Sequence, residues 1–575
     1  MIKSDKTTGY MQIALIVSTD VVPAWVASVA ERLDNFKTSR IKLVLVQESI
    51  GRGAEDEVEE YASNQREFGV FKNKLDGFGR VLAWLLRGCG QAEVELKDAF
   101  ASKFIKTVLP AVDICGIKEF GKYNESCGTK SENQLTSETQ EFQFDLIVNL
   151  GHEKIIRDIS SLARYGVWTI EHPQCIPGFA TLLSGFWESI DERPTTGCVV
   201  RRYTSDKARP QVLSSTWAST ITSSVEDNRR SIAWQAVPLI PRLVAKLHRL
   251  GEKKFNDEIK LLNLHPTAFS GRSVDYISNA TLLSILLRRI FRRVTKAFES
   301  ALWMEQWTIF VRRSILDDIE MCRFVRTLPP KDRFWADPYL LEIGGVTYVF
   351  FEEVLRANGR GHIAVGEVSD TGLIENVRVA LTAPHHLSHP FVFMYCGEIY
   401  MIPESRASKC ITLYRCAALP DKWEKVCNLM EDVDASDVTL HFYNSVWWLF
   451  VNMSEVEGAS TSVELFIYSS VDFPSNTWKP HEKNPVISDS RKARSAGQLF
   501  IRNGLLYRPS QDCSYTYGWR FSINHVHLLS FDDYCERSVT VAEPGWERDI
   551  VRTHTFNQVE GTQVIDGMIR RPRWW

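Results

Sequence analysis

The segment Tyr339-Leu-Leu-Glu-Ile-Gly-Gly-Val-Thr-Tyr-Val-Phe-Phe-Glu352 consists of an apolar strand, a tight turn at two glycines and a second, aromatic-rich strand. The same order of strand, turn and strand returns in three further segments: Phe391–Glu404, Val438–Phe450 and Gln498–Pro509. Each turn contains Gly or Asn. A repeat of about 50 residues built from short strands is typical of a β-propeller with one blade per repeat.

A fifth and weaker repeat lies around residues 553–567. The run Trp307–Arg312 precedes the first repeat and has the composition of a strand. Such a strand closes the ring if it joins the last blade. The sequence therefore predicts an all-β five-bladed propeller over residues 306–575.

Polar residues recur where the innermost strand of each predicted blade begins. The entrances read Trp335-Ala-Asp-Pro338, Leu387-Ser-His-Pro390, Ala435-Ser-Asp-Val438, Arg494-Ser-Ala-Gly497 and Thr553-His-Thr555. Because innermost strands surround the central channel, we expect these side chains to converge there. Asp at a strand start often serves only a turn, but its recurrence in successive repeats favours a ligand pocket.

Carboxyl groups near such a pocket suit glycoside chemistry, which needs one acid and one base or nucleophile. Residues Glu352, Glu353 and Glu404 end the second strands of their repeats. The candidate catalytic residues of the propeller are Asp337, Asp437 and Glu404. The candidate substrate-binding residues are Glu353, His389, Arg494, Asp512 and His554.

The first part of the chain has a different pattern. Short apolar runs such as Ile13–Ser18, Lys42–Gln47 and Phe144–Leu150 alternate with amphipathic stretches such as Trp25–Phe36. Strands buried on both faces and separated by helices predict a parallel sheet in an α/β domain over residues 1–251.

Residues 252–305 are predicted to form a helical connector. Its stretch Leu282–Ala301 has apolar residues at helical spacing and several basic companions. We favour a helix packed between domains; the alternative is a helix that lies on a membrane surface.

Composition narrows the class of protein. The 575 residues are 44% hydrophobic and 24% charged and carry a net charge of −3, which fits a folded multidomain protein and gives no reason to expect nucleic acid. The 12 cysteines show no zinc-type spacing, so we predict no metal and reduced thiols in a cytoplasmic protein. The polar N-terminus does not resemble a signal peptide, and we expect no bilayer-spanning segment.

The propeller region resembles two families. The Ala-Asp-Pro opening is similar to that of the furanosidase and inverting-arabinanase clan of glycosidases, which implies a base or nucleophile at Asp337. The clan's second-blade Asp is replaced by His389 here, and Glu404 is our candidate for its general acid. Phe334-Trp-Ala-Asp-Pro338, His386–Phe393, Gly397–Ser405, Leu413-Tyr-Arg415 and Tyr507–Asp512 resemble the propeller-like domain of plant glucosamine inositolphosphorylceramide transferases and their bacterial relatives.

The N-terminal part resembles the catalytic domain of formyltransferases, on the stretches Asp145–Gly151, Tyr165–Pro177, Gly185–Glu188 and Pro194–Gly197. That resemblance implies formyl-tetrahydrofolate as cofactor and His172 as a catalytic residue, with Asp206 as the nearest match to the family's Asp. Two positions depart from the motif: Ile170 stands where the family has Asn, and Gln174 where it has Ser.

Three functions follow as hypotheses. In the first, the N-terminal domain transfers a formyl or other acyl group to an amino sugar that the propeller binds. In the second, the propeller performs glycosidase or transglycosidase chemistry and the N-terminal domain is a degenerate scaffold. In the third, the protein is a non-catalytic glycan-binding or assembly protein.

Overall fold

The structure is a computed structural model that describes residues 10–48, 98–99, 101–116, 144–151, 159–173, 185–205, 209–264, 279–313 and 323–574. Most of the chain divides into two compact units, residues 1–288 and 289–575, apart from two short exchanged segments at 217–219 and 456–459. Strands greatly outnumber helices.

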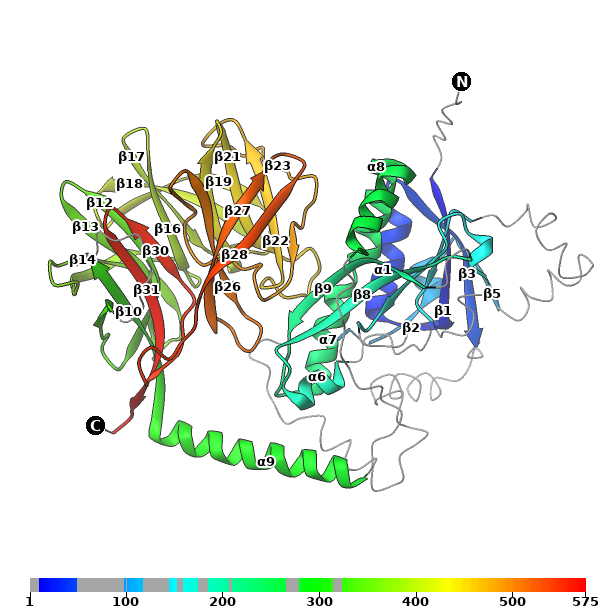
Figure 1. Cartoon of the computed structure of the whole chain (residues 1–575), viewed down its shortest axis with the longest axis horizontal. Coiled ribbons are helices and arrows are strands. Elements are labelled where there is room, and N and C mark those ends of the chain that lie inside the picture. The colour runs from blue at the N-terminus through cyan, green and yellow to red at the C-terminus, as the bar shows by residue number, and fades with distance from the viewer. Residues whose placement is uncertain are drawn as a thin grey trace, which may run out of the picture. The chain divides into compact units, whose positions relative to one another are not determined.

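The N-terminal unit contains a seven-stranded sheet in the order β5-β3-β1-β6-β7-β8-β9 (Figure 1). The strands are β1 (Met11–Thr19), β3 (Ser39–Glu48), β5 (Asp113–Gly116), β6 (Leu146–Asn149), β7 (Val167–Glu171), β8 (Thr195–Tyr203) and β9 (Gln211–Ser219). The first five run parallel to their neighbours, and β8 is antiparallel to β7. Strands β1, β6 and β7 are almost wholly buried, which explains their continuous apolar sequence.

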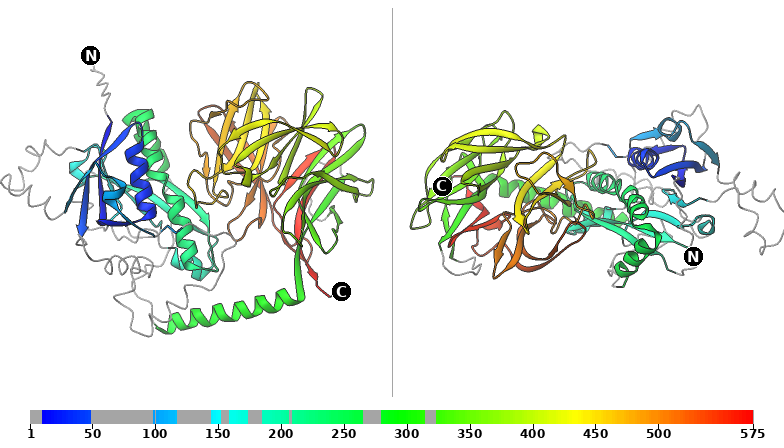
Figure 2. Two further views of the ribbon diagram at one scale, coloured as in Figure 1. Left: turned by 180° about the vertical axis from the view of Figure 1, so that it is seen from behind. Right: turned by 90° about the horizontal axis from the view of Figure 1, so that it is seen from above.

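Helices accompany this sheet. Helix α1 (Ala24–Asn35) follows β1, and α7 (Val225–Ala236) and α8 (Leu239–Leu262) follow β9. Helices α1 and α8 lie side by side (Figures 1 and 2). Phe255 of α8 stacks on Trp168 of β7, with the ring centroids 5.9 Å apart. Helix α8 is kinked at Gly251, which has a φ of 74°, so the boundary expected at this residue falls inside the helix.

The C-terminal unit is the predicted five-bladed propeller, because its strands form five separate antiparallel sheets around a ring (Figures 1 and 2). Blade 1 contains β12 (Arg333–Ile343), β13 (Val346–Leu355), β14 (Gly361–Val368) and β15 (Ile374–Leu381); blade 2 contains β16 (Ser388–Tyr395), β17 (Glu398–Glu404), β18 (Cys410–Ala418) and β19 (Lys422–Glu431). Blade 3 contains β20 (Ala435–Tyr443), β21 (Val446–Met453), β22 (Glu464–Ser470), β23 (Lys479–Pro480) and β24 (Ile487–Ser488). Blade 4 contains β25 (Phe500–Arg502), β26 (Leu505–Asp512), β27 (Arg520–Leu529) and β28 (Tyr534–Ala542).

Blade 5 joins the two ends of the unit. It contains β10 (Trp303–Arg313), β11 (Val325–Thr327), β29 (Ile550–Arg552), β30 (Phe556–Val559) and β31 (Thr562–Pro572). Strand β10 pairs with β31 along its whole length, from Trp303 opposite Pro572 to Arg313 opposite Thr562. The prediction that the strand before the first repeat closes the ring is therefore confirmed.

The same two-residue turn joins the first hairpin of every blade. Its central residues are Gly344-Gly345, Cys396-Gly397, Asn444-Ser445, Asn503-Gly504 and Glu560-Gly561, and all ten have positive φ. A two-residue turn with positive φ at both positions matches the right-handed twist of its strands, and Gly and Asn reach this backbone region at the lowest cost. The turn at Glu560-Gly561 identifies the fifth blade, whose strands are the least regular in sequence.

The hydrophobic core of the propeller lies between neighbouring blades. One cluster spans blades 1 to 3 and contains Tyr339, Phe391 and Leu440, and further clusters join blade 3 to blade 4 and blade 5 to blades 1 and 4. Each blade buries both of its faces in this way, so the strands carry apolar residues at successive positions.

Candidate active site

A repeated β-bulge positions the polar residues at the entrances of blades 1, 2 and 3. Pairing between the first two strands shifts at Ala336/Tyr339, Ser388/Phe391 and Ser436/Thr439. Inside each shift stands one residue with positive φ: Asp337 (51°), His389 (44°) and Asp437 (45°). A bulge redirects one side chain, and strained non-glycine backbone of this kind clusters at functional sites.

The three redirected side chains, together with residues from the other two blades, make contact with one another. Asp337 Oδ2 accepts a hydrogen bond from the His389 backbone N–H at 3.3 Å. The His389 Nδ1 atom lies 3.5 Å from Asp437 Oδ1, and its Nε2 atom is 2.8 Å from the Tyr339 hydroxyl. His554, just before β30, contacts Asp337 across the junction of blades 5 and 1. The structure thus brings the predicted entrance residues together at the centre of the ring.

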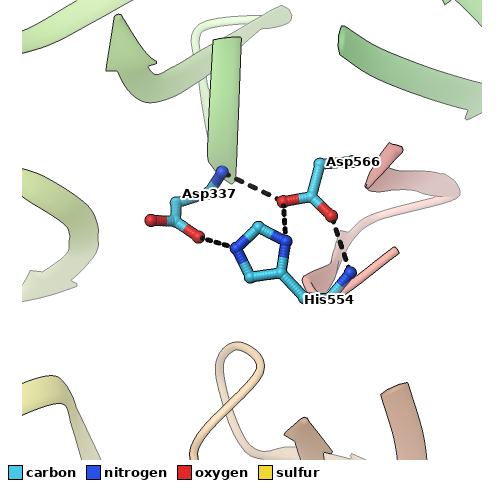
Figure 3. Close-up of side chains that lie close together, drawn as sticks. All are labelled: Asp337, His554 and Asp566. Carbon is cyan, nitrogen blue, oxygen red and sulfur yellow. Dashed lines mark hydrogen bonds and ion pairs between the residues drawn. The ribbon is translucent and has the colours of Figure 1, made fainter. Parts of the chain in front are cut away.

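His554 lies between two carboxylates (Figure 3). Its Nε2 atom is 2.9 Å from Asp337 Oδ1, and its Nδ1 atom is 2.9 Å from Asp566 Oδ2. Burial opposes protonation of the imidazole, but Asp566 and Asp337 together raise the pKa of His554 to about 10. Burial also opposes ionisation of Asp337, yet His554 and its hydrogen bond hold the pKa of that carboxyl well below its usual range. His554 and Asp337 therefore form a buried ion pair, and Asp566 lies on the other side of the imidazole.

Asp437 is the second fixed carboxylate. Arg494 donates to both of its oxygens through Nε and Nη2, and Gln511 Nε2 donates at 3.0 Å. Burial favours the neutral acid, but Arg494 above all lowers the pKa of Asp437. Burial also lowers the pKa of His389.

Glu404 differs from the other carboxyl groups at the centre. Its Oε2 atom accepts a hydrogen bond of 2.9 Å from the Asp437 backbone N–H and lies 3.7 Å from Arg494 Nη2. Burial and the charge of Asp437 raise the pKa of Glu404 well above its usual value. A raised pKa favours the protonated acid, which can donate, whereas the pKa values of Asp337 and Asp437 are lowered. This pair of opposite shifts is the electrostatic pattern of acid and base catalysis.

An exposed aromatic ring lies beside these charges. The Tyr517 ring centroid is 4.8 Å from the Arg494 guanidinium carbon and 5.5 Å from the His554 ring. Tyr517 is 46% exposed. It therefore offers an aromatic face from which a ligand can approach the buried residues.

Among the described residues, one group has the composition of a metal site: Asp337, His554 and Asp566. Both ring nitrogens of His554 already face a carboxylate oxygen at 2.9 Å. A cation bound there has to displace the imidazole proton, because both compete for the same carboxylates. The protonated imidazole thus already supplies the positive charge that the two carboxylates require.

Two predicted substrate-binding residues make their contacts elsewhere. Glu353 accepts hydrogen bonds from Trp335 Nε1 at 2.8 Å and from Arg333 Nη1 at 3.1 Å, all within blade 1. Its neighbour in sequence, Glu352, points to the other face of the strand and pairs with His386 at 2.8 Å. Asp512 pairs with Arg520 at 3.0 Å. Within the described part of the chain, the partners of Glu353 and Asp512 lie away from the centre.

Sequence reasoning missed four residues at the centre: Tyr339, Gln511, Tyr517 and Asp566. Gln511 lies in the stretch Tyr507–Asp512, near the end of β26, and Asp566 lies within the weak fifth repeat, in the middle of β31. Comparison with Glu404, which ends β17, could have pointed to Gln511. Tyr517 lies in a connection between β26 and β27 that does not repeat, so no pattern marks it.

The N-terminal unit contains a second pair of buried ionisable groups. His172 follows β7 directly, and its Nε2 atom is 2.9 Å from Glu188 Oε1 on α6 (Phe186–Asp191). Burial opposes ionisation of Glu188, but His172 and Arg193 hold its pKa below the usual value. Ile170, at the position of the formyltransferase Asn, is a fully buried residue of β7. Asp206, Gln174 and Pro177 lie outside the described residues, and among the described residues Glu188 is an acidic partner of His172.

Fold and site define the C-terminal unit as a five-bladed β-propeller with a buried cluster of acids and bases at its centre. Residues 314–559 match the family model described as glucosamine inositolphosphorylceramide transferase 1, N-terminal. Similar proteins include a glucosamine inositolphosphorylceramide transferase 1 of Oryza sativa subsp. japonica, 35% identical over 241 residues, which are 41% of this chain and 32% of that protein. One of Arabidopsis thaliana is 38% identical over 211 residues, 36% of this chain and 27% of that protein. The chain therefore spans about a third of the length of these relatives.

Two solved structures are examples of the structural likeness. Zg3597, a family 117 glycoside hydrolase produced by Zobellia galactanivorans, covers 46% of this chain and 90% of its own at 11% identity and a TM-score of 0.31. The catalytic domain of a GH62 alpha-L-arabinofuranosidase of Coprinopsis cinerea covers 44% and 84% at 10% identity and a TM-score of 0.31. The family match begins at residue 314, so it does not include the N-terminal unit.

Proposed function

We propose that the propeller binds a sugar-bearing substrate at its centre, cleaves a glycosidic bond and passes the glycosyl group to water or to another acceptor. Glu404 acts as the proton donor and Asp337 as the ionised base or nucleophile. The observation that carries this proposal is the opposite direction of their pKa shifts: raised at Glu404 and lowered at Asp337. Glycoside chemistry needs one carboxyl group in each state.

The residues around Glu404 and Asp337 have supporting roles in this proposal. Arg494 and Gln511 hold Asp437 as a fixed negative charge, and that charge favours the protonated form of Glu404. His554 holds Asp337 ionised. Tyr517 offers a ring face on which a sugar can stack. In this assignment Asp437 and His554 act as positioning residues, because each acts through another carboxyl group.

The relatives suggest the substrate class. They carry the name glucosamine inositolphosphorylceramide transferase, and this chain shares only a propeller-containing part of them. We therefore propose a glycan attached to an inositolphosphorylceramide-like lipid as the substrate.

The test compares Glu404→Gln and Asp337→Asn with Glu424→Gln, a matched change of an exposed glutamate on blade 2. Each protein is incubated with a panel of glycosylated inositolphosphorylceramides, products are measured by mass spectrometry, and binding is measured by calorimetry. We expect the two central variants to lose about 100-fold or more of turnover while they still bind substrate. Turnover equal to that of Glu424→Gln would refute the assignment. Binding without turnover in the wild type would instead support a non-catalytic glycan-binding protein.

A second candidate function rests on the buried pair His172–Glu188 at the carboxyl end of β7, the edge where open sheets of parallel strands bind ligands. We propose acyl transfer from an activated acyl donor to the amine of an amino sugar: the amine forms the new C–N bond, the donor group leaves with the electron pair of the bond that breaks, and His172 accepts the amine proton, with Glu188 as its orienting partner. The described residues do not fit formyl-tetrahydrofolate fully, because buried Ile170 supplies no amide donor for the oxyanion. We therefore assign no step to a folate.

A thermal-shift titration of the full chain with a stable folate analogue tests this candidate. Saturable stabilisation that His172→Gln abolishes supports it. A flat response across the titration removes formyl-tetrahydrofolate as the donor. His362→Gln, a change at a histidine of blade 1, is the matched control.

A further inference from the structure

Helix α9 (Asn279–Leu302) leads into the propeller (Figure 1). Several of its apolar side chains are exposed to solvent. They include Leu287, Ile290, Phe291, Val294, Phe298 and Leu302, which are 38–68% exposed. Their spacing of three and four residues places them in one stripe along the helix. We call these six residues the α9 face.

The opposite side of α9 is basic. It carries Arg288, Arg289, Arg292, Arg293 and Lys296. No acidic residue occurs in the helix before Glu299. Helical geometry at 100° per residue puts these five cations across from the α9 face and along its borders.

The C-terminal tail fixes the end of α9 to the propeller. The Arg573 backbone N–H donates to the Leu302 carbonyl at 3.0 Å, and its Nε atom donates to the Ser300 carbonyl at 2.7 Å. Trp574 Nε1 donates to the Ala301 carbonyl at 3.3 Å. These bonds satisfy carbonyl groups that a helix end leaves free, so the last turn of α9 is held rigidly against blade 5.

Two tryptophans mark this end of the helix. Trp574 is 75% exposed and Trp303, the first residue of β10, is 42% exposed. Tryptophan combines an apolar ring with a polar N–H, and it is enriched where membranes meet water. The exposed tryptophans are therefore a second feature typical of a membrane surface, independent of the apolar stripe.

A helix of this kind needs a partner for its apolar face, because helices in water gain most of their stability from burying that face. None of the helices in the described ranges has the length and apolarity that crossing a bilayer requires. An apolar stripe opposed by arginine and lysine, with tryptophan at its end, fits the boundary between lipid headgroups and acyl chains. Long basic side chains reach from the helix to the anionic headgroups.

We propose that α9 lies in the surface of an anionic membrane and docks the propeller there. The α9 face inserts among the acyl chains, and the five cations bind the headgroups. Charge complementarity selects an anionic surface over a neutral one. The proposal does not depend on the chemistry assigned to Glu404 and stands if that assignment fails.

The test is co-sedimentation of the full chain with sucrose-loaded vesicles of phosphatidylcholine, with and without 30% phosphatidylserine. We expect sedimentation with the anionic vesicles only, weakened by high salt because exposed charges are screened. Phe291→Asp/Phe298→Asp and Arg292→Glu/Arg293→Glu should each lower the partition coefficient about tenfold or more. The matched controls are Val471→Asp, an exposed apolar residue of the propeller, and Lys422→Glu/Lys425→Glu on blade 2; both should sediment like the wild type.

Three results would overturn the proposal: equal sedimentation with and without phosphatidylserine, no sedimentation of the wild type with anionic vesicles, or equal sedimentation of the α9 variants and their controls. Sedimentation equilibrium distinguishes the main competing occupant. If the wild type is a dimer that Phe291→Asp/Phe298→Asp dissociates, and vesicles bind neither, then a second copy covers the α9 face and the membrane proposal is wrong. All four variants change exposed residues, so equal melting temperatures verify that they fold.

Discussion

At the residue scale, the centre of the propeller consists of buried charges that compensate one another. Asp337, Asp437 and Asp566 face His554 and Arg494. Burying any of them alone would be costly, because a low-dielectric interior disfavours an unpaired charge. At Glu404, burial and the neighbouring charge of Asp437 raise the pKa well above its usual value. The local balance of charge thus shifts the pKa values of neighbouring carboxyl groups in opposite directions.

The first prediction concerns His554. Removing its imidazole leaves the carboxylates of Asp337 and Asp566 buried without their cation, so His554→Gln should lower the free energy of unfolding by about 3–5 kcal/mol. The folded pKa of His554 is about 10, above the ordinary value of about 6.5. Its stabilisation is therefore complete below pH about 6.5 and is lost as pH rises towards 10.

Urea denaturation between pH 6 and pH 10 measures this effect. The wild type should lose more stability across this range than His554→Gln. The control is His441→Gln, since burial lowers the pKa of His441 to about 4 and the imidazole stays neutral throughout. Equal slopes for wild type and His554→Gln would show that His554 is neutral in the folded protein.

The second prediction concerns the pH dependence of turnover. A donor at Glu404 must hold its proton, so activity should fall as pH rises through its elevated pKa. The nearby charge of Arg494 lowers that pKa, so Arg494→Gln should move the alkaline limb of the pH–rate profile to higher pH. Arg520→Gln, which alters the partner of Asp512 instead, should leave the limb in place. A limb that stays unchanged in Arg494→Gln would exclude Glu404 as the group that titrates.

At the element scale, two backbone features repeat around the ring: the bulge at the entrances of blades 1, 2 and 3, and the two-residue turn in the first hairpin of every blade. Blade 4 has neither Asp nor His at its entrance but Gly497, with a φ of 146°. A Cβ atom there would lie 2.0 Å from the Phe556 carbonyl oxygen of blade 5. The glycine thus permits the close approach of blades 4 and 5.

The third prediction compares two glycines. Gly497→Ala should lower the free energy of unfolding by about 2–4 kcal/mol, because it adds both a clash and backbone strain. Gly504→Ala, in a turn whose added Cβ would meet nothing within 4 Å, should cost only about 1 kcal/mol for its positive φ. Thermal unfolding of both variants checks the difference. Similar losses would mean that backbone strain alone, and not the contact with blade 5, fixes Gly497.

At the scale of the whole molecule, closure of the ring joins residues that are far apart in sequence. Eleven residue pairs connect β10 to β31. The Asn557 side chain adds a hydrogen bond of 2.7 Å to the Pro338 carbonyl, and Asp566 accepts one from the Asp337 N–H at 3.2 Å. The site depends on this closure, because blades 1 and 5 both contribute to it.

The fourth prediction follows from this closure. Deleting residues 562–575 removes β31 and Asp566, so the propeller should lose its cooperative unfolding transition. Deleting residues 573–575 removes only the hydrogen bonds to the end of α9, each worth about 1 kcal/mol, and should leave the transition in place. Differential scanning calorimetry distinguishes the two. A cooperative propeller transition in the longer deletion would show that ring closure is dispensable for folding.

The sequence alone determined the number of blades, the position of the closing strand and the polar residues at the blade entrances. These features are local, because each repeat carries its own strands and turn residues. Similar repeats place equivalent residues at equivalent points of a ring. The N-terminal strands and α1 could be predicted for the same reason, from their continuous apolar runs and helical spacing.

Tertiary structure alone decided the chemistry of the site. Asp337, Glu404 and Asp437 are similar carboxyl groups in sequence, and their pKa values differ because of burial and of their distances from His554, Arg494 and one another. The tertiary structure also places Glu352 and Glu353 on opposite faces of β13, Glu188 beside His172 and Asp566 at the centre of the propeller. Electrostatic energy depends on distance and burial in three dimensions, and neither quantity is encoded in the spacing of residues along the chain.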